Sequence, residues 1–410
     1  MDTSAILKKV ILIICITAFY QGLHAQTEKN IALKANFIYG NILKHTTHLT
    51  NLVKGSVVGG EFDIEWQTMG EENWHQYFNF PQIGVGVVGL DLGNPEMLGQ
   101  LAAVYPYLNF KLLDLKFMQL NLKGGAGMSF LNKTFNNTAT DLNNLNTGNA
   151  AIGSVVNVYF AGGGSVEFPF GKAWSAYGAF NWNHASNGSF YQPNSGINML
   201  NASVGIRYNP VWMMNYKPEI KGIPYMPQKF TLEVIASGGV RELYYRDNKM
   251  FPTGSLVVSL FRQIGNNLRL GLAVDNFYDG VYGSVFIARN NPLNTTKYGF
   301  TYITEDKLAN KFRVGVSLQP ELVFGKITAG IHFGMYLYNP IKNLEPYSEA
   351  SVTTLNKPLI YSYNIEEESG WFYTRASLKY AFSKHLFASL GLKTHLQKAE
   401  FIEWGMGYRF

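Results

Sequence analysis

The chain has only one cysteine among its 410 residues. That cysteine, Cys15, lies in an apolar run that follows Lys8 and Lys9, a pattern typical of a secretory signal peptide over residues 1–25. Because the run continues past Cys15, a lipid anchor is not indicated there. The mature protein is therefore expected to begin near Gln26 and to have no thiol chemistry.

Long apolar runs and charge clusters are also missing. Beyond the signal peptide, no stretch offers about 18 consecutive apolar residues, so a membrane-spanning helix is not expected. The formal net charge of +6 is spread along the chain without a basic cluster, and we expect no nucleic-acid partner. Charged residues make up only 15% of the chain, against roughly 25% in soluble globular proteins.

Aromatic residues and glycine are abundant instead, with 28 Phe, 25 Tyr and 41 Gly. Phe62, Ile64 and Trp66 alternate with polar residues, as side chains do on a strand with one apolar and one polar face. The same alternation recurs over residues 118–123, 268–275 and 311–319. In an exported chain this pattern predicts an all-β, transmembrane antiparallel barrel, because soluble sandwiches usually have shorter strands and more evenly charged polar faces.

The end of the chain supports the same fold class. Trp404, Met406, Tyr408 and Phe410 alternate with polar residues and glycine, so the chain stops on an aromatic residue at the end of a strand. A terminal Tyr-x-Phe resembles the C-terminal signature of bacterial outer-membrane barrels, which the assembly machinery reads. We therefore expect that machinery to be a partner through Phe410, and the cell outer membrane to be the location.

Alternating segments number about 16, eight before Asn209 and eight after Gln228. Between them, residues 210–227 hold four prolines, which argue against a central strand. The chain then forms either one barrel with an elaborated turn, which we favour, or two tandem eight-stranded barrels, with residues 26–209 and 228–410 as the two halves. Turn-rich segments predicted to be exposed loops cover residues 132–148, 290–306 and 340–367.

Residues 173–208 contain the candidate site. They are predicted to form two antiparallel strands whose outward apolar faces end in polar residues, His184 and Ser186 on the first strand and Asn198 on the second. If His184 lies opposite Asn198, their Cβ atoms are about 4.5–5.5 Å apart. This pattern predicts Ser186 as a nucleophile, His184 as its general base and Asn198 as the acceptor that orients the imidazole.

These residues resemble a known family. The segments His-Ala-Ser-Asn-Gly, Gln-Pro-Asn-Ser-Gly-Ile-Asn and Gly-Ile-Arg-Tyr, at 184–188, 192–198 and 205–208, are similar to the active-site hairpin of outer-membrane lipid A 3-O-deacylases, grouped with acyloxyacyl hydrolase-like proteins. The resemblance implies removal of an ester-linked acyl chain from lipid A or lipopolysaccharide at a lipid-facing site. It places the family's histidine on His184, its serine on Ser186 and its oxyanion-hole asparagine on Asn187, with the amide of Gly188 as a second donor.

The sequence departs from this family in two places. Asn198 stands where the family has glutamate, and the half from Gln228 onward has no counterpart in the short members. An amide orients an imidazole but does not offset the charge that forms on His184; in a serine protease, the change from aspartate to asparagine costs about 10⁴ in turnover. We therefore expect activity that is low, or that is sustained by a carboxylate elsewhere.

Rival interpretations remain open. The barrel would otherwise be a non-catalytic pore or uptake channel, or a structural or adhesive barrel whose long loops bind partners. At the residue level, His184 would be an interfacial polar residue and Asn198 a strand cap, and Asn194 is predicted to be a turn residue. His45 and His48 have no third ligand at a convincing spacing, so we predict a solvated loop there and no metal or other cofactor.

Overall fold

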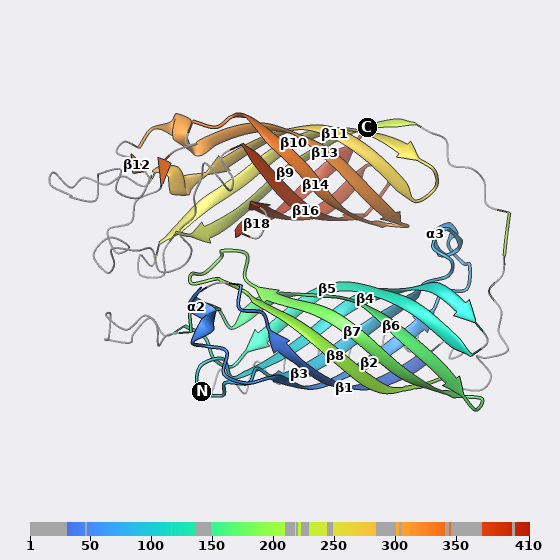
Figure 1. Ribbon diagram of the computed structural model, residues 1–410. Helices are drawn as coiled ribbons and strands as arrows, with labels where there is room; N and C mark the ends of the chain where they lie inside the picture. The colour runs from blue at the N-terminus through green and yellow to red at the C-terminus, as the bar shows by residue number, and fades with distance from the viewer. Residues whose placement is uncertain are drawn as a thin grey trace, which may run out of the picture.

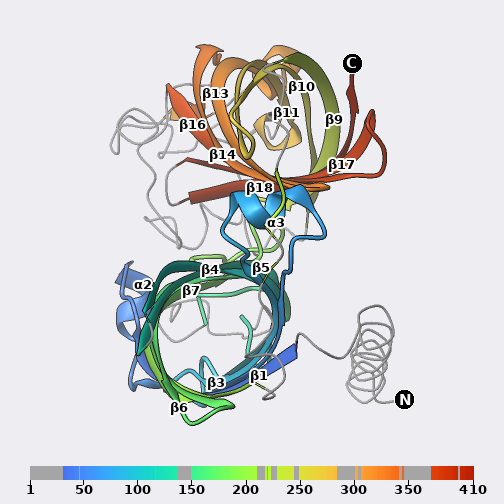
Figure 2. The same cartoon turned by 90° about the vertical axis from the view of Figure 1, so that its right-hand side faces the viewer.

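The computed structural model describes residues 31–45, 47–115, 117–135, 149–209, 218, 220–222, 229–243, 249–283, 301–302, 306–340, 344–345, 371–395 and 398–410. The predicted signal peptide lies outside these residues. So do most of the connection at 210–227 and of the predicted loops at 132–148, 290–306 and 340–367. The described chain forms two closed barrels that lie side by side (Figure 1 and Figure 2).

The first barrel closes in sequence order, with each strand antiparallel to the next and the last paired to the first. Its strands are β1 (Ile31–Ile42), β2 (Val57–Gln67), β3 (Gln82–Asp91), β4 (Gln100–Leu115), β5 (Met118–Leu131), β6 (Val156–Phe170), β7 (Trp174–Ser186) and β8 (Ile197–Tyr208). Two short helices lie between its strands, α2 (Thr47–Thr50) and α3 (Asn73–Tyr77).

The second barrel repeats this design with the C-terminal strand paired to its first strand. Its strands are β9 (Phe230–Glu242), β10 (Met250–Ile264), β11 (Leu268–Asp279), β13 (Phe312–Phe324), β14 (Ile327–Tyr338), β16 (Phe372–Ala381), β17 (Leu386–His395) and β18 (Lys398–Arg409). The other elements of this half are not strands of the barrel: the 3-10 helices η4 (Gly280–Gly283) and η6 (Leu308–Lys311), and a parallel pair of two-residue strands, β12 (Thr301–Tyr302) and β15 (Leu344–Glu345).

The strands turn their apolar residues outward and their polar residues inward. In β7 the outward Phe180 and Trp182 are 60% and 41% exposed, whereas the inward Asn181 and Asn183 are buried. A soluble barrel would show the reverse arrangement. An apolar outer wall over a polar interior is what lipid requires of a barrel.

Paired charges fill the interiors. Glu65 accepts from Lys34 Nζ at 2.8 Å and from Arg207 Nε at 3.1 Å in the first barrel, and Arg269 Nη1 lies 2.6 Å from Glu233 Oε1 in the second. All five side chains are nearly inaccessible to solvent. An eight-stranded barrel encloses just enough space for such side chains, so each half is complete with eight strands.

The prediction of about 16 barrel strands, eight on each side of residues 210–227, is confirmed. The favoured single barrel is not what forms; the tandem pair is the correct architecture. Each sheet closes on itself because β1 pairs with β8 and β9 pairs with β18. The alternation of polar and apolar residues assigns a face to each residue, but it does not specify which distant strands pair.

The two barrels contact each other beside α3. The ring of Phe78, which follows this helix, stacks on Phe324 of β13 at 4.5 Å between centroids, and Trp74 meets the same ring edge-on at 6.1 Å. Figure 2 shows α3 between the barrels. At the opposite ends of the strands, the loop between β7 and β8 contacts the second barrel, as described below.

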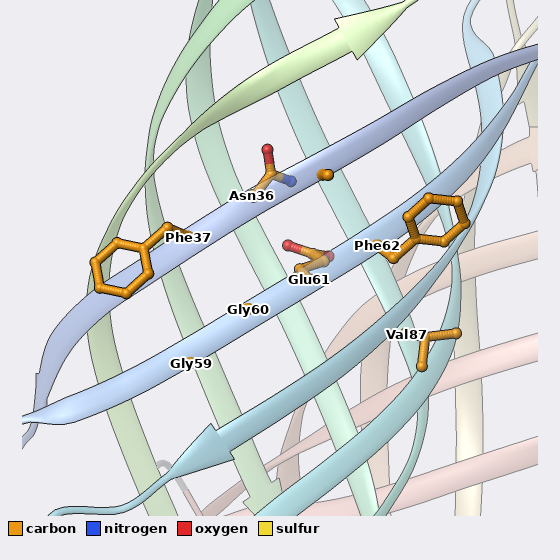
Figure 3. A pocket seen from close by; sticks show the side chains of 8 residues that line it. Asn36, Phe37, Gly59, Gly60, Glu61, Phe62 and Val87 are labelled. Carbon is orange, nitrogen blue, oxygen red and sulfur yellow. The ribbon is translucent and has the colours of Figure 1, made fainter.

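Two further features lie away from the site. A shallow depression in the outer wall of the first barrel lies where Gly59 and Gly60 leave the backbone of β2 uncovered beside Phe37, Phe62 and Val87 (Figure 3). None of the predicted site residues lines it. Within the described part of the chain, none of the helices has the length and apolar character needed to cross a membrane.

Candidate active site

The β7–β8 hairpin places the candidate residues on one face. His184 pairs with Asn198 and Trp182 with Leu200, which is the register expected from the sequence. His184, Ser186 and Asn198 have the parity of the exposed Trp182 and therefore lie on the outer wall. Ser186 is nevertheless only 5% exposed, because it stands at the strand end, where a loop folds over it.

The three side chains form one hydrogen-bonded chain. His184 Nε2 lies 2.8 Å from Ser186 Oγ, and His184 Nδ1 lies 2.8 Å from Asn198 Oδ1. An amide oxygen only accepts, so the ring hydrogen belongs on Nδ1, and Nε2 accepts from the serine hydroxyl. Both ring nitrogens of His184 are thereby hydrogen-bonded. The carboxylate that was expected elsewhere in the chain is therefore not bonded to this imidazole.

His45 joins the chain as a further member. Asn198 Nδ2 lies 3.3 Å from His45 Nδ1, and His45 Nε2 lies 2.9 Å from the carbonyl oxygen of Ser195. The sequence interpretation placed His45 in a solvated loop. The pairing of β1 with β8 brings His45 to this position, because the amide of Leu43, two residues earlier, donates to the Asn198 carbonyl at 2.8 Å.

The loop after Ser186 is held by Asn187. Its backbone N–H donates to Asn194 Oδ1 at 3.0 Å, and its side-chain amide donates to Ser154 Oγ and to the Tyr191 carbonyl, both at 2.9 Å. All three N–H groups of Asn187 are thus bonded within or beside the loop. Asn194 was predicted to be a turn residue; it lies in the irregular part of the loop, where its side chain holds the residue that follows the serine. The contact with Ser154 was not predicted from the sequence.

Two glycines shape the backbone around the imidazole. Gly188 and Gly196 have φ of 62° and 74°, in the left-handed region that favours glycine. A Cβ on Gly196 would lie 2.9 Å from His184 Cε1 and 3.5 Å from Ser186 Cβ. The backbone of the returning strand therefore approaches the His184–Ser186 pair more closely than a side chain would permit.

The predicted residues divide into two groups. The structure brings His184, Ser186 and Asn198 into direct contact, and it places Asn187 and Gly188 in the adjoining loop. Within the described residues, His, Cys, Asp and Glu side chains do not gather into a group that would hold a metal ion.

A hydroxyl, an imidazole and an amide in one hydrogen-bonded chain define a barrel with a serine–histidine site on its outer wall. Residues 60–207 match the family model of the lipid A 3-O-deacylases (PagL), and residues 230–351 and 359–410 match that of the acyloxyacyl hydrolase C-terminal domain. The two models account for most of the chain, one in each barrel. The chain belongs to the lipid A 3-O-deacylase and acyloxyacyl hydrolase family, and the resemblance found in the hairpin is confirmed.

Three similar solved structures share little sequence with the chain. The outer membrane enzyme PagL is 14% identical, with a TM-score of 0.28, over 42% of this chain and 97% of its own. BamA from Haemophilus ducreyi is 12% identical, with a TM-score of 0.20, over 94% of this chain and 71% of its own. The toluene transporter TodX from P. putida is 10% identical, with a TM-score of 0.17, over 94% of this chain and 88% of its own. These TM-scores are too low to support conclusions about function. No curated protein sequence matches the chain.

Proposed function

We propose that this chain is a serine esterase of the outer membrane that removes an ester-linked acyl chain from lipid A or a related lipid. The observation that carries the proposal is the hydrogen-bonded chain from Ser186 through His184 to Asn198 on the outward face of the hairpin. A site on that face meets lipid, so the substrate reaches it by lateral diffusion in the outer leaflet. Family membership supports lipopolysaccharide as the source of that lipid.

The geometry supports acyl transfer through the serine. Ser186 Oγ would attack the ester carbonyl while His184 Nε2 takes the hydroxyl proton, which forms a tetrahedral oxyanion. Collapse breaks the bond to the lipid alcohol, and that alcohol leaves with the proton from His184. Water then hydrolyses the acyl-enzyme along the same proton path and releases the fatty acid. We assign the N–H of Gly188 to the oxyanion, because the N–H groups of Asn187 are bonded in the loop.

The orientation of the Asn198 amide decides whether His184 is a base. When the amide oxygen faces His184 Nδ1, the ring hydrogen sits on Nδ1 and Nε2 accepts the serine proton. When the amide nitrogen faces Nδ1, the ring hydrogen sits on Nε2, and His184 no longer acts as a base toward Ser186. His45 supports the productive orientation in the tautomer whose hydrogen sits on Nε2: that nitrogen donates to the Ser195 carbonyl and leaves Nδ1 to accept from the Asn198 nitrogen. In the other tautomer Nδ1 donates to the Leu43 carbonyl at 3.0 Å and does not accept from Asn198.

The direct test of the function is the mass spectrum of lipid A from cells that express the wild-type chain, compared with cells that carry an empty vector. We expect the wild-type spectrum to contain species that have lost one fatty acid. Cells that express Ser175→Ala should match the wild type, since Ser175 lies buried in β7, 11 residues before Ser186. Identical spectra with and without the protein would contradict the proposal.

Removal of His45 should lower turnover without weakening substrate binding. In His45→Ala the Asn198 amide loses its fixed orientation, and we expect kcat to fall about 10-fold, with KM changed less than about twofold. His45→Gln still presents an acceptor and should recover much of the loss. Steady-state kinetics of purified protein in detergent micelles measure both constants; equal kcat in all three proteins would exclude this role of His45.

A carboxylate at position 198 should raise activity. Asn198→Asp keeps the acceptor for His184 Nδ1 and adds the charge that stabilises the imidazolium, so we expect kcat to rise about 10-fold. The gain is smaller than the full serine-protease effect because the wild-type amide already selects the right tautomer. Asn198→Leu, which removes the acceptor, should lower kcat in the same assay. A folded Asn198→Asp protein with reduced kcat would contradict this account of the triad.

The rival function, a non-catalytic pore, gains no support from the interiors. Lys123 Nζ lies 2.9 Å from Glu61 Oε1 in the first barrel, and Lys379 Nζ lies 2.7 Å from Glu321 Oε1 in the second. Buried ion pairs occupy the space that a pore would leave to water. Conductance in planar bilayers combined with unchanged lipid A would favour the pore.

A further inference from the structure

The loop after Ser186 does not rest on its own barrel alone. Ser189 Oγ donates to the Ala399 carbonyl at 2.7 Å, and the amide of Glu242 donates to the Ser189 carbonyl at 3.2 Å. The amide of Gln192 donates to Glu242 Oε2 at 2.7 Å. Ala399 and Glu242 belong to β18 and β9, so three hydrogen bonds join this loop to the second barrel. Figure 1 shows the loop, in green, extending toward β18.

An apolar contact completes this junction. A Cβ on Gly188 would collide with Ile402 Cγ1 and Cδ1 and would lie 3.4 Å from Leu392 Cδ1. Leu392 and Ile402 are a cross-strand pair on the outer face of β17 and β18. The backbone of Gly188, whose N–H is assigned as the oxyanion donor, therefore packs directly on the wall of the other barrel.

The backbone of the loop needs such support. Gly188 and Ser189 have φ of 62° and 69°, so two successive residues are left-handed, and a serine adopts that conformation only where its surroundings hold it. The second barrel bonds to both the hydroxyl and the carbonyl of Ser189. Both Ser189 and Glu242 are buried, which strengthens these bonds and excludes competing water.

We propose that the second barrel completes the esterase site by holding this loop, with Glu242 as a positioning residue and Ile402 as its apolar support. The proposal rests on the proposed function and gives the C-terminal half a role in it. The direction of the Gly188 N–H depends on the left-handed turn, and the turn depends on the second barrel. The first barrel carries the reacting side chains, but its site is incomplete without the second.

The test uses the full chain with Glu242→Ala, Glu242→Gln and Ile402→Ala. We expect kcat to fall about 10- to 100-fold in Glu242→Ala, with KM within about threefold, because substrate contacts remain while the oxyanion donor is misplaced. Glu242→Gln keeps an acceptor for the Gln192 amide and should stay within about threefold of the wild type. Asp306→Ala is the matched control, since this carboxylate of the second barrel pairs with Lys311 instead of the loop.

Amide hydrogen exchange provides a readout that does not depend on catalysis. Residues 187–192 should exchange at least about 10-fold faster in Glu242→Ala and in Ile402→Ala than in the wild type, while both barrels keep their heat-modifiable mobility on gels. Unchanged exchange, or wild-type kcat in folded Glu242→Ala and Ile402→Ala, would overturn the role of the second barrel. A wild-type protein without esterase activity would instead overturn the proposed function, and with it the role of Glu242 in positioning the oxyanion donor.

Discussion

Ser186→Ala should abolish deacylation, with kcat reduced roughly 10⁴- to 10⁶-fold, which is the range that loss of the nucleophile causes in serine hydrolases. The hydroxyl donates to His184 Nε2 at 2.8 Å, and no other hydroxyl of the described residues bonds to that nitrogen. Ser189 lies in the same loop, but its hydroxyl donates to the Ala399 carbonyl of the second barrel. Without Ser186 the acyl-enzyme cannot form, and only direct attack by water remains.

Release of free fatty acid from purified lipopolysaccharide, measured by mass spectrometry with protein in detergent, gives kcat for this variant. Ser175→Ala tests whether loss of any serine hydroxyl from β7 matters, and it should retain wild-type kcat. A folded Ser186→Ala protein that keeps more than about a tenth of wild-type turnover would show that another group carries out the reaction.

His184→Ala should be nearly as severe, with kcat lowered roughly 10⁴- to 10⁶-fold. In the proposed mechanism the imidazole takes the proton from Ser186 and returns it to the leaving alcohol, so its loss should leave an inactive hydroxyl. Because serine and histidine act as a unit, the double variant with Ser186→Ala should be no slower than either single variant. Multiplied losses would indicate two independent roles and contradict the proton path.

His184→Ala also removes the ring between Trp182 and the loop, so folding must be checked separately. Trp182 stacks on His184 with 5.7 Å between centroids and 12° between planes. His184→Phe is the matched variant, because it keeps an aromatic ring beside Trp182 while it removes both nitrogens. Equal losses in the two variants would assign the effect to the proton path, whereas a rescue by phenylalanine would assign it to packing.

The periodicity of the sequence was enough to predict the wall and the core of the site. A period of two places His184 and Ser186 on the outer face with Trp182, and the hairpin register sets Asn198 opposite His184. These relationships are local, because one hairpin contains all of them. The strand count followed from the same alternation, as did the division of the strands at the proline-rich connection.

Relationships between distant segments were not predictable in this way. Barrel closure through β1 and β8 brings His45 to Asn198, and docking of the barrels brings Glu242 to the β7–β8 loop. Both contacts join residues that are at least 50 positions apart, and neither His45 nor Glu242 belongs to the hairpin whose alternation predicts the site. The internal bonding of Asn187 also depends on Ser154, which precedes β6 and approaches the loop only in the folded barrel.

The most direct test of the central claim is labelling of the intact protein with a fluorophosphonate, followed by peptide mapping. In the proposed mechanism, the hydrogen bond to His184 Nε2 activates the Ser186 hydroxyl, so we predict a single adduct on Ser186 that His184→Ala slows at least about 100-fold. A folded wild-type protein that takes no label at Ser186, or that takes it equally fast without the imidazole, would contradict the claim that this outer-wall serine is an activated nucleophile.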